Sequence, residues 1–305
     1  MPTSDNMTEH RPTTFADLDW DELWRNARAS KTWTSSGVKD WDEKAPSFSS
    51  RNQSSPFVSQ VLDLIPLTAS ATVLDIGCGP GTLAMPIASR VRSVTAVDYS
   101  AGMLSTLASL ASPAGIRNIR TVQASWEDDW QAHGIGQHDI TLASRSLAVA
   151  DLRGALQRLD RYASSFAFIV DRISPTPFDP EAFAAVGRSF DGGPDYIYVL
   201  NTLYDMGIHA NVRIISLERE TRFADLDDAM RSYGWMIKNM SAGEEASLRR
   251  YLETKCRPAD DGRIVVERGF TPRWACIWWS KADQAPSGPA MPPESREARL
   301  TPCAS

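Results

Sequence analysis

Apolar positions in the first half of the chain follow two alternating spacings. Short apolar runs, typical of strands buried on both faces, occupy residues 72–76, 93–97, 119–123, 139–143 and 166–171. Stretches with helical spacing lie among them, at residues 57–65, 82–90, 102–111 and 152–162. Strands that alternate with helices in this way predict crossover units and a parallel sheet with helices on both faces.

The alternation ends at Asp171. Prolines at positions 175, 177 and 180 then break the pattern, and helical spacing resumes as far as Met206. Beyond it we expect a half-exposed strand, two charged helices and two β-type runs joined by a turn, at residues 212–223, 226–233, 244–255 and 263–280. The last two runs predict that the sheet finishes in an antiparallel hairpin.

The two ends of the chain differ from its centre. The polar segment 1–16 and the segment 283–305, rich in proline, alanine and serine, are predicted to be disordered. The pattern predicts an N-terminal helical lid, one main domain and two helical insertions in that domain, at residues 17–56, 57–282, about 175–210 and about 225–256. Tryptophans 20, 24, 33 and 41 make the N-terminal segment either a lid over a substrate cleft or a helix pinned to the core.

A glycine cluster follows the first predicted strand, in VLDIGCGPGT. Gly77, Gly79 and Gly81 depart from the G-x-G-x-x-G spacing of dinucleotide sites, because the third glycine comes one residue early. Asp75 precedes the cluster by two residues, where it would repel a pyrophosphate but suits an ammonium group. Asp98 ends the second strand, where a carboxylate can accept hydrogen bonds from both hydroxyls of a ribose. S-adenosylmethionine combines an ammonium group and a ribose without a phosphate; a dinucleotide site or a structural turn is the alternative.

Composition and charge narrow the range of functions. The net charge of -6 and pI near 5.3 argue against a nucleic-acid partner, because backbone binding needs a positive surface. The sequence contains no run of about 18 apolar residues, so no membrane helix is expected. Cysteines and histidines are scattered without ligand spacing, so neither a metal site nor a disulfide framework is expected. These features predict a cytoplasmic protein.

Three segments carry a resemblance to a known family. VLDIGCGPGT, VTAVDYSAGML and HDITLASRSLAVADL, in this order and spacing, resemble the class I S-adenosylmethionine-dependent methyltransferases of small-molecule type. The resemblance covers about residues 41–175. It implies an α/β fold with a Rossmann-like, seven-stranded, mostly parallel sheet, helices on both faces and a C-terminal antiparallel hairpin strand. It also implies an enzyme with S-adenosyl-L-methionine as cofactor.

The resemblance also implies a set of cofactor-binding residues. They are Asp75, Gly77, Cys78, Gly79 and Gly81 for the methionine moiety, Asp98 for the ribose, Tyr99, Met103, Ser125, Trp126 and Glu127 around the adenine, and Ser144 towards the methyl group. The family commonly has aspartate where this chain has Ser125, so a backbone N–H of Trp126 is the alternative donor to adenine. WDEKAPSF, residues 41–48, resembles the entry helix that small-molecule members place over the cofactor.

Methyl transfer from a sulfonium depends mainly on alignment, so the lack of a histidine or metal cluster does not argue against activity. Candidate catalytic residues are Arg145, Tyr204 and His209. Arg145 either binds an acceptor carboxylate or phosphate or pairs with Asp171. We expect a small-molecule acceptor, because residues 143–147 lack the Asn-Pro-Pro-aromatic run of amino-methyltransferases acting on nucleic acid. A non-catalytic cofactor-binding or regulatory protein is the alternative, ahead of a nucleic-acid or protein methyltransferase; the sequence does not indicate an oligomeric state.

Overall fold

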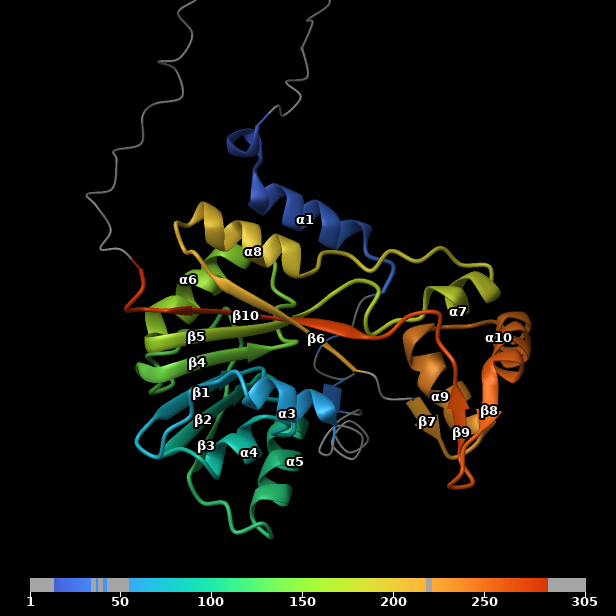
Figure 1. Ribbon diagram of the computed structural model, residues 1–305, viewed down its shortest axis with the longest axis horizontal. Coiled ribbons are helices and arrows are strands. Elements are labelled where there is room, and N and C mark those ends of the chain that lie inside the picture. Colours follow the sequence, from blue (N-terminus) through green and yellow to red (C-terminus); the bar gives the residue numbers. More distant parts are fainter. Residues whose placement is uncertain (1–13, 34–36, 38–40, 43–54, 218–220, 285–305) are drawn as a thin grey trace, which may run out of the picture.

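A computed structural model describes residues 14–33, 37, 41–42, 55–217 and 221–284. Its main feature is a seven-stranded sheet in the order β3-β2-β1-β4-β5-β10-β6 (Figure 1). The strands are β1 Thr72–Ile76, β2 Ser93–Asp98, β3 Ile119–Gln123, β4 His138–Ser144, β5 Ala163–Arg172, β6 Asn211–Ser216 and β10 Arg273–Ser280. Strand β10 runs antiparallel to β5 and β6, and the other neighbouring pairs are parallel. The predicted fold class is confirmed.

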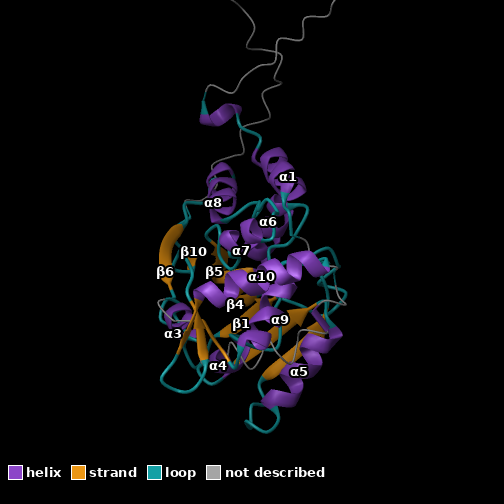
Figure 2. Cartoon of the chain, turned by 90° about the vertical axis from the view of Figure 1, so that its right-hand side faces the viewer, coloured by secondary structure: helices purple, strands orange, loops and turns teal. Residues whose placement is uncertain are grey.

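Helices cover both faces of this sheet (Figures 1 and 2). One face carries α1 Trp20–Ser30, α6 Leu152–Tyr162 and α8 Tyr196–Asp205, and the other carries α3 Pro56–Leu62, α4 Ala84–Ala88 and α5 Ala101–Ala111. Successive strand residues point to opposite faces, so Leu74 packs in the first core and Val73 in the second. This two-sided burial explains why the central strands are apolar throughout.

A second module packs beside the carboxyl ends of the strands (Figure 1). It consists of α7 Pro180–Ala185 and residues 221–267, with a three-stranded sheet in the order β7-β9-β8. Its other elements are β7 Thr221–Phe223, α9 Leu226–Met236, α10 Ala242–Lys255, β8 Cys256–Pro258 and β9 Ile264–Val266. It has its own hydrophobic core.

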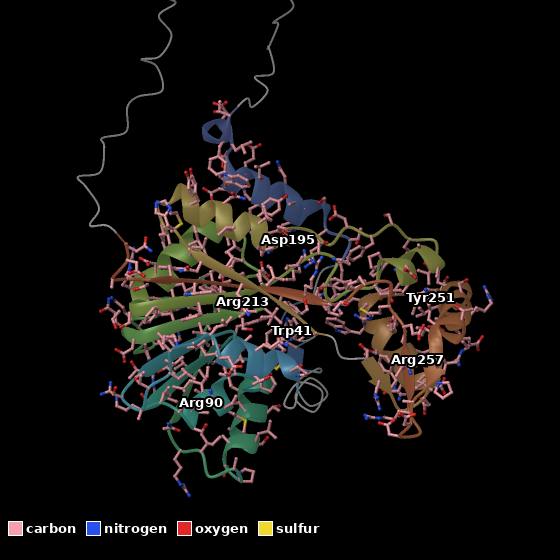
Figure 3. The ribbon with its side chains drawn as sticks, in the orientation of Figure 1. Trp41, Arg90, Asp195, Arg213, Tyr251 and Arg257 are labelled. Atoms are coloured by element: carbon pink, nitrogen blue, oxygen red, sulfur yellow. The ribbon has the colours of Figure 1, made fainter. Side chains whose placement is uncertain are left out.

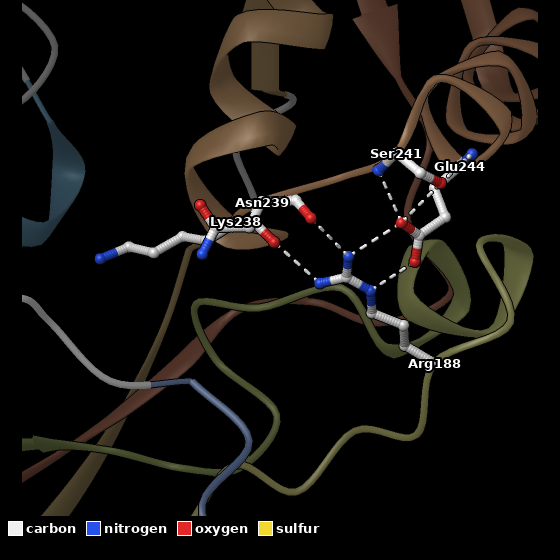
Figure 4. A network of polar contacts seen from close by, with 5 residues as sticks. All are labelled: Arg188, Lys238, Asn239, Ser241 and Glu244. Carbon is white, nitrogen blue, oxygen red and sulfur yellow. Dashed lines mark hydrogen bonds and ion pairs between the residues drawn. The ribbon is translucent and has the colours of Figure 1, made fainter.

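An arginine joins three parts of the second module. Nε of Arg188 donates to Oε1 of Glu244 at 2.6 Å. Its Nη1 and Nη2 donate to the carbonyl oxygens of Lys238 and Asn239 at 2.8 and 3.1 Å (Figure 4). Glu244 also forms a capping box with Ser241 at the start of α10. Arg188, three residues after the end of α7, is thereby bonded to the segment between α9 and α10 and to the first turn of α10.

Three predictions need correction. The two β-type runs of residues 263–280 do not pair with each other, because β9 joins the small sheet while β10 enters the large one. Residues 212–223 form two strands, β6 and β7, that belong to different sheets. Residues 15–17 form a short 3-10 helix, η1 Phe15–Asp17, whereas residues 1–16 were expected to be disordered. Residues 1–13 and 285–305 lie outside the described part.

The tryptophans of the N-terminal segment lie in two places. The indole of Trp24 is buried, and its Nε1 donates to the carbonyl of Val149 at 2.9 Å. Trp20 lies edge-on to Tyr198 of α8, so both residues pin α1 to the main domain. Trp33 and Trp41 instead contact Trp235 of α9, with ring centroids 4.8 and 6.3 Å apart. Figure 3 shows Trp41 between the large sheet and the second module.

Candidate cofactor site

The glycine loop, residues 77–81, leaves β1 and is bonded to the end of β2. The amides of Gly77 and Cys78 both donate to the carbonyl of Val97, at 2.8 and 3.0 Å. Gly77 has φ +68°, and a Cβ on it would lie 2.2 Å from Cβ of Ser146. Oγ of Ser146 donates to the carbonyl of Ile76 at 2.7 Å. Only glycine fits at position 77, because the end of β4 closes over the loop.

Asp98 is held at the end of β2 by backbone amides. Its Oδ2 accepts from the amide of Gly79 and its Oδ1 from the amide of Ser100, both at 2.9 Å. The residue is buried, and burial raises the pKa of Asp98 although both amides favour the charged form. The Asp98 carboxylate therefore fixes the glycine loop. It lies at the end of β2, where a ribose-binding acid is expected.

Asp75 is a buried carboxylate in the middle of the sheet. It is 1% exposed and lies in register between Ala96 of β2 and Leu142 of β4. Its Oδ2 has no hydrogen-bond partner among the described residues. Burial raises the pKa of Asp75 to about 7, with a further contribution from the charge of Asp98. A cationic ligand group would supply the missing partner, which fits the ammonium of S-adenosylmethionine.

The predicted adenine turn follows β3 and is closed by its own side chains. The amide of Ser125 donates to Oδ2 of Asp128 at 2.7 Å, and Oγ of Ser125 accepts from the amide of Glu127 at 3.2 Å. Trp126 donates from Nε1 to the carbonyl of Ser146 at 3.0 Å. The turn is therefore bonded to the loop after β4, on the side where the glycine loop lies.

Ser144 and Arg145 end β4 beside β5. Oγ of Ser144 is buried and has no hydrogen-bond partner among the described residues. Arg145 has φ +58°, and its guanidinium lies 4.5 Å from the ring centroid of Phe57 and 5.4 Å from that of Trp274. Burial lowers the pKa of Arg145 to about 10. Of the two alternatives for Arg145, acceptor binding or a structural role, these aromatic contacts favour the structural role.

The other predicted residues surround the loop in different ways. Met103 is buried, and its sulfur would lie 3.9 Å from a Cβ on Gly79. Tyr99 is 37% exposed next to Asp98. Cys78 is buried in the second core, where burial raises the pKa of its thiol. Gly81 has φ +85°, and a Cβ there would lie 2.3 Å from Leu107 of α5, so this glycine permits close packing of that helix.

The family model described as "Methyltransferase domain" matches residues 73–166. This segment runs from β1 into β5 and contains both acids, the glycine loop and the adenine turn. A protein of Haemophilus influenzae without a characterised function is 32% identical over 270 residues, which cover 88% of this chain and 98% of that protein. The chain belongs to the class I S-adenosylmethionine-dependent methyltransferases.

Other relatives share parts of this methyltransferase. Aklanonic acid methyltransferase DauC of a Streptomyces species is 30% identical over 139 residues, which cover 42% of this chain and 61% of DauC. The YcgJ protein of Bacillus subtilis has a similar fold, with a TM-score of 0.51 and 17% identity, over 73% of this chain and 97% of YcgJ.

Asp42 is a residue of the methyltransferase site that the sequence did not single out. Its Oδ1 accepts from Oγ of Ser100 at 2.5 Å and from the amide of Gly102 at 2.9 Å. A Cβ on Gly102 would lie 2.9 Å from Cα of Asp42, so the segment is tightly seated on the start of α5. The WDEKAPSF motif was the available signal; its residues 43–48 lie outside the described part.

Two candidate catalytic residues of the methyltransferase lie far from this site. Tyr204 ends α8 and is 56% exposed, with its ring against Phe15 and His209. His209 is exposed and precedes β6, which is four strands away from β1, or about 19 Å at the usual strand spacing. Methyl transfer requires reacting atoms about 3 Å apart, so neither residue acts on the methyl group.

In the described part of the methyltransferase, histidines, cysteines and acids form no group of three or more that could hold a metal ion. No described helix is long and apolar enough to cross a membrane.

Proposed function

We propose that this enzyme transfers the methyl group of S-adenosylmethionine to a small-molecule acceptor. The observation that carries the proposal is the buried Asp75 carboxylate, with an oxygen that lacks a partner among the described residues, beside a glycine loop fixed by Asp98. An ammonium group at Asp75 and a ribose at Asp98 fit the two acids. A pyrophosphate does not fit, because the Asp75 carboxylate before the glycine loop would repel it.

The proposed cofactor site uses backbone and side-chain groups at the carboxyl ends of β1, β2, β3 and β4. The proposed residues are Asp75, Gly77, Cys78, Gly79, Gly81, Asp98, Tyr99, Met103, Ser125, Trp126, Glu127 and Ser144. Gly77 and Gly79 have positive φ and bring the backbone close to the ligand. Cys78 and Gly81 contribute mainly through packing, as their buried contacts indicate.

S-adenosylmethionine supplies a methyl group on a sulfonium, which is a good leaving group. The chain therefore has to align the acceptor and exclude water, and alignment alone is worth roughly 7–11 kcal/mol in the best intramolecular models. Trp41 and the second module lie over the carboxyl edge of the sheet and serve this purpose. Oγ of Ser144 is a buried polar group at this edge that is available to a ligand.

A small molecule is the acceptor class that the chain favours. The net charge is -6, which disfavours a polyanionic nucleic acid. DauC, whose name gives aklanonic acid as its substrate, shows that a related sequence acts on a small organic acid. The cysteines at 78, 256 and 276 are free thiols, which supports a reducing cytoplasmic setting as part of the proposal.

Transfer of a radioactive methyl group tests the proposal. The protein is incubated with S-adenosylmethionine labelled on the methyl group and with the small-molecule, nucleic-acid and protein fractions of a cell extract. Label is expected in the small-molecule fraction, and Asp98→Asn should abolish it. Label in a macromolecular fraction would overturn the acceptor class. Cofactor binding without transfer to any fraction would favour a binding or regulatory protein.

A further inference from the structure

Charged side chains gather where the end of α1, the end of β5 and the loop before α8 meet. Lys31 follows α1, Asp171 and Arg172 end β5, and the loop is the DGGPD segment, residues 191–195. Thr32 fastens this junction: its amide and its Oγ1 both donate to the carbonyl of Asp191 at 3.0 Å. Figure 3 shows Asp195 at the end of α8 that is nearer to the second module.

The Lys31 side chain has a fixed course along the loop. Gly193 has φ +71°, and a Cβ there would lie 3.0 Å from Cβ, Cγ and Cδ of Lys31. The glycine therefore leaves a slot for the aliphatic part of the lysine. Nζ lies 5.2 Å from the ring centroid of Trp33, and no carboxylate of the described residues forms an ion pair with it.

Arg172 is held by the same loop and keeps one nitrogen unused. Its Nε donates to the carbonyl of Pro194 at 3.1 Å, and its Nη2 donates to the carbonyls of Gly192 and Pro194. Its Nη1 is buried and has no hydrogen-bond partner among the described residues. A Cβ on Gly192 would lie 2.9 Å from Nη1, so only glycine lets the loop pack this closely on the guanidinium. Uncharged carbonyls bind the guanidinium directly, and the charges of Asp171, Asp195 and Asp191 act on it without forming an ion pair in the described part of the chain.

The junction brings several cations together beside acidic residues. Burial and the charges of Arg172 and Arg28 lower the pKa of Lys31 to about 8, and Asp171 opposes them. Nζ of Lys238 lies 5.2 Å from the same Trp33 ring. Burial raises the pKa of Asp171 to about 6, so this acid is mostly ionised at neutral pH, and Asp191 and Asp195 lie in the same junction.

The junction lies on the acceptor side of the proposed cofactor site. The amide of Arg145, after β4, donates to the carbonyl of Val170, so β4 and β5 end together. Strand β5 is two strands from β1, or roughly 10 Å at the usual spacing. This separation suits an acceptor with one end at the methyl group and the other at the junction.

We propose that Lys31 and Arg172 bind a carboxylate of the methyl acceptor. The proposal rests on the proposed function and adds the substrate class. Two donors are available, the Lys31 ammonium and Nη1 of Arg172, and they match the two oxygens of a carboxylate. A phosphate monoester, with three oxygens and up to two charges, would leave one oxygen without a donor. The Trp33 ring beside Lys31 favours an acceptor that is aromatic near its carboxylate.

Benzoate and its neutral isostere benzamide test this inference on the full chain saturated with S-adenosylhomocysteine. Saturation-transfer NMR titrations give both dissociation constants. Benzoate is expected to bind at least about tenfold more tightly than benzamide, and Lys31→Met should remove this difference. Lys31→Arg should keep it. Lys255→Met is the matched control, because Lys255 pairs with Glu181 in the second module and should leave benzoate binding unchanged.

The pH dependence separates a direct role of Lys31 from a structural one. Benzoate affinity should fall as the pH rises through about 8 in the natural protein, and should stay constant in Lys31→Arg, whose guanidinium keeps its charge. The charged groups around Lys31 are Arg28, Asp171, Arg172, Asp191, Asp195 and Lys238.

Three results would overturn the carboxylate site. They are equal binding of benzoate and benzamide, unchanged benzoate binding in a folded Lys31→Met protein, and tighter binding of phenyl phosphate than of benzoate. Loss of S-adenosylhomocysteine binding would instead count against the proposed function. The benzoate titration on ligand-free protein would then still decide the inference.

Discussion

At the residue scale, Asp75 is where stability and binding oppose each other. In the unfolded chain its pKa lies near 3.8, and burial raises the pKa to about 7 in the folded protein. Between these values the folded protein keeps a proton that the unfolded chain has lost. Stability is therefore highest below the unfolded pKa and falls as the pH rises to about 7. A bound ammonium group would stabilise the ionised Asp75 carboxylate and so offset this loss of stability.

We expect Asp75→Asn to stabilise the ligand-free protein at pH 8. The shift of about three pKa units sets an upper limit of about 4 kcal/mol on the gain, which should shrink to nothing towards pH 4. Urea denaturation of both proteins at several pH values measures the difference in their free energies of unfolding. Titratable groups that both proteins share contribute equally and cancel in this difference. The account would be contradicted if the stability gained by Asp75→Asn over the natural protein were smaller at pH 8 than at pH 5.

The glycine loop gives a second prediction at this scale. Gly77→Ala should cost about 3 kcal/mol or more, because it adds a clash with Ser146 to the strain of positive φ. Gly115→Ala is the matched control: its φ is +70°, with nothing within 4 Å of the added Cβ, so about 1–2 kcal/mol is expected. Equal losses in denaturant unfolding would show that the loop is not closed by Ser146.

Residues with a local motif were predictable, and residues defined by contacts across the chain were not. Asp75, Gly77 and Asp98 stand in a short stretch whose order and spacing indicate their surroundings. Asp42 and Ser146 act through partners 58 and 70 residues away, so the motifs that contain them do not indicate these contacts. The separation of Tyr204 and His209 from the glycine loop has the same origin, since it follows from strand order.

At the scale of elements, long periodic segments were predicted well and the arrangement of the short strands was not. All strands of the large sheet were anticipated, although β6 was merged with β7, and β9 was predicted as the first β-type run of residues 263–280. Strand β8 was missed, because its three residues are too few for a period of two to be recognised. Their sheet holds only because α7, α9 and α10 pack on it.

Asp179 connects these elements, and its removal should loosen the second module alone. Its Oδ1 accepts from the amides of Glu181 and Ala182 at the start of α7, and its Oδ2 accepts from the hydroxyl of Tyr233 at 3.0 Å. Asp179→Ala leaves these donors without an acceptor and should cost about 3 kcal/mol. Hydrogen exchange should accelerate in α7, α9 and α10 and stay slow in β1 and β4. Asp179→Asn keeps an acceptor oxygen and should cost less; equal acceleration in both modules would contradict this.

At the scale of the whole molecule, residues 221–267 of the second module are an insertion between the neighbouring strands β6 and β10. The amide of Leu217 donates to the carbonyl of Pro272 at 2.9 Å, so the chain leaves the large sheet after β6 and returns beside the same point to form β10. The insertion faces the carboxyl edge of the sheet (Figure 1). The sequence predicted a helical insertion at about residues 225–256, but not its three-stranded sheet or the pairing of β6 with β10, because those strands pair over more than 50 residues.

The central claim is that the carboxyl edge of the large sheet binds S-adenosylmethionine through Asp75, Asp98 and the glycine loop. Isothermal titration calorimetry of the natural protein, Asp98→Asn and the exposed control Asp63→Asn tests it most directly. The natural protein and Asp63→Asn should bind S-adenosylmethionine with equal affinity, and Asp98→Asn should bind at least about a hundredfold more weakly while remaining folded. Unchanged affinity in a folded Asp98→Asn protein, or no binding by the natural protein, would contradict the account.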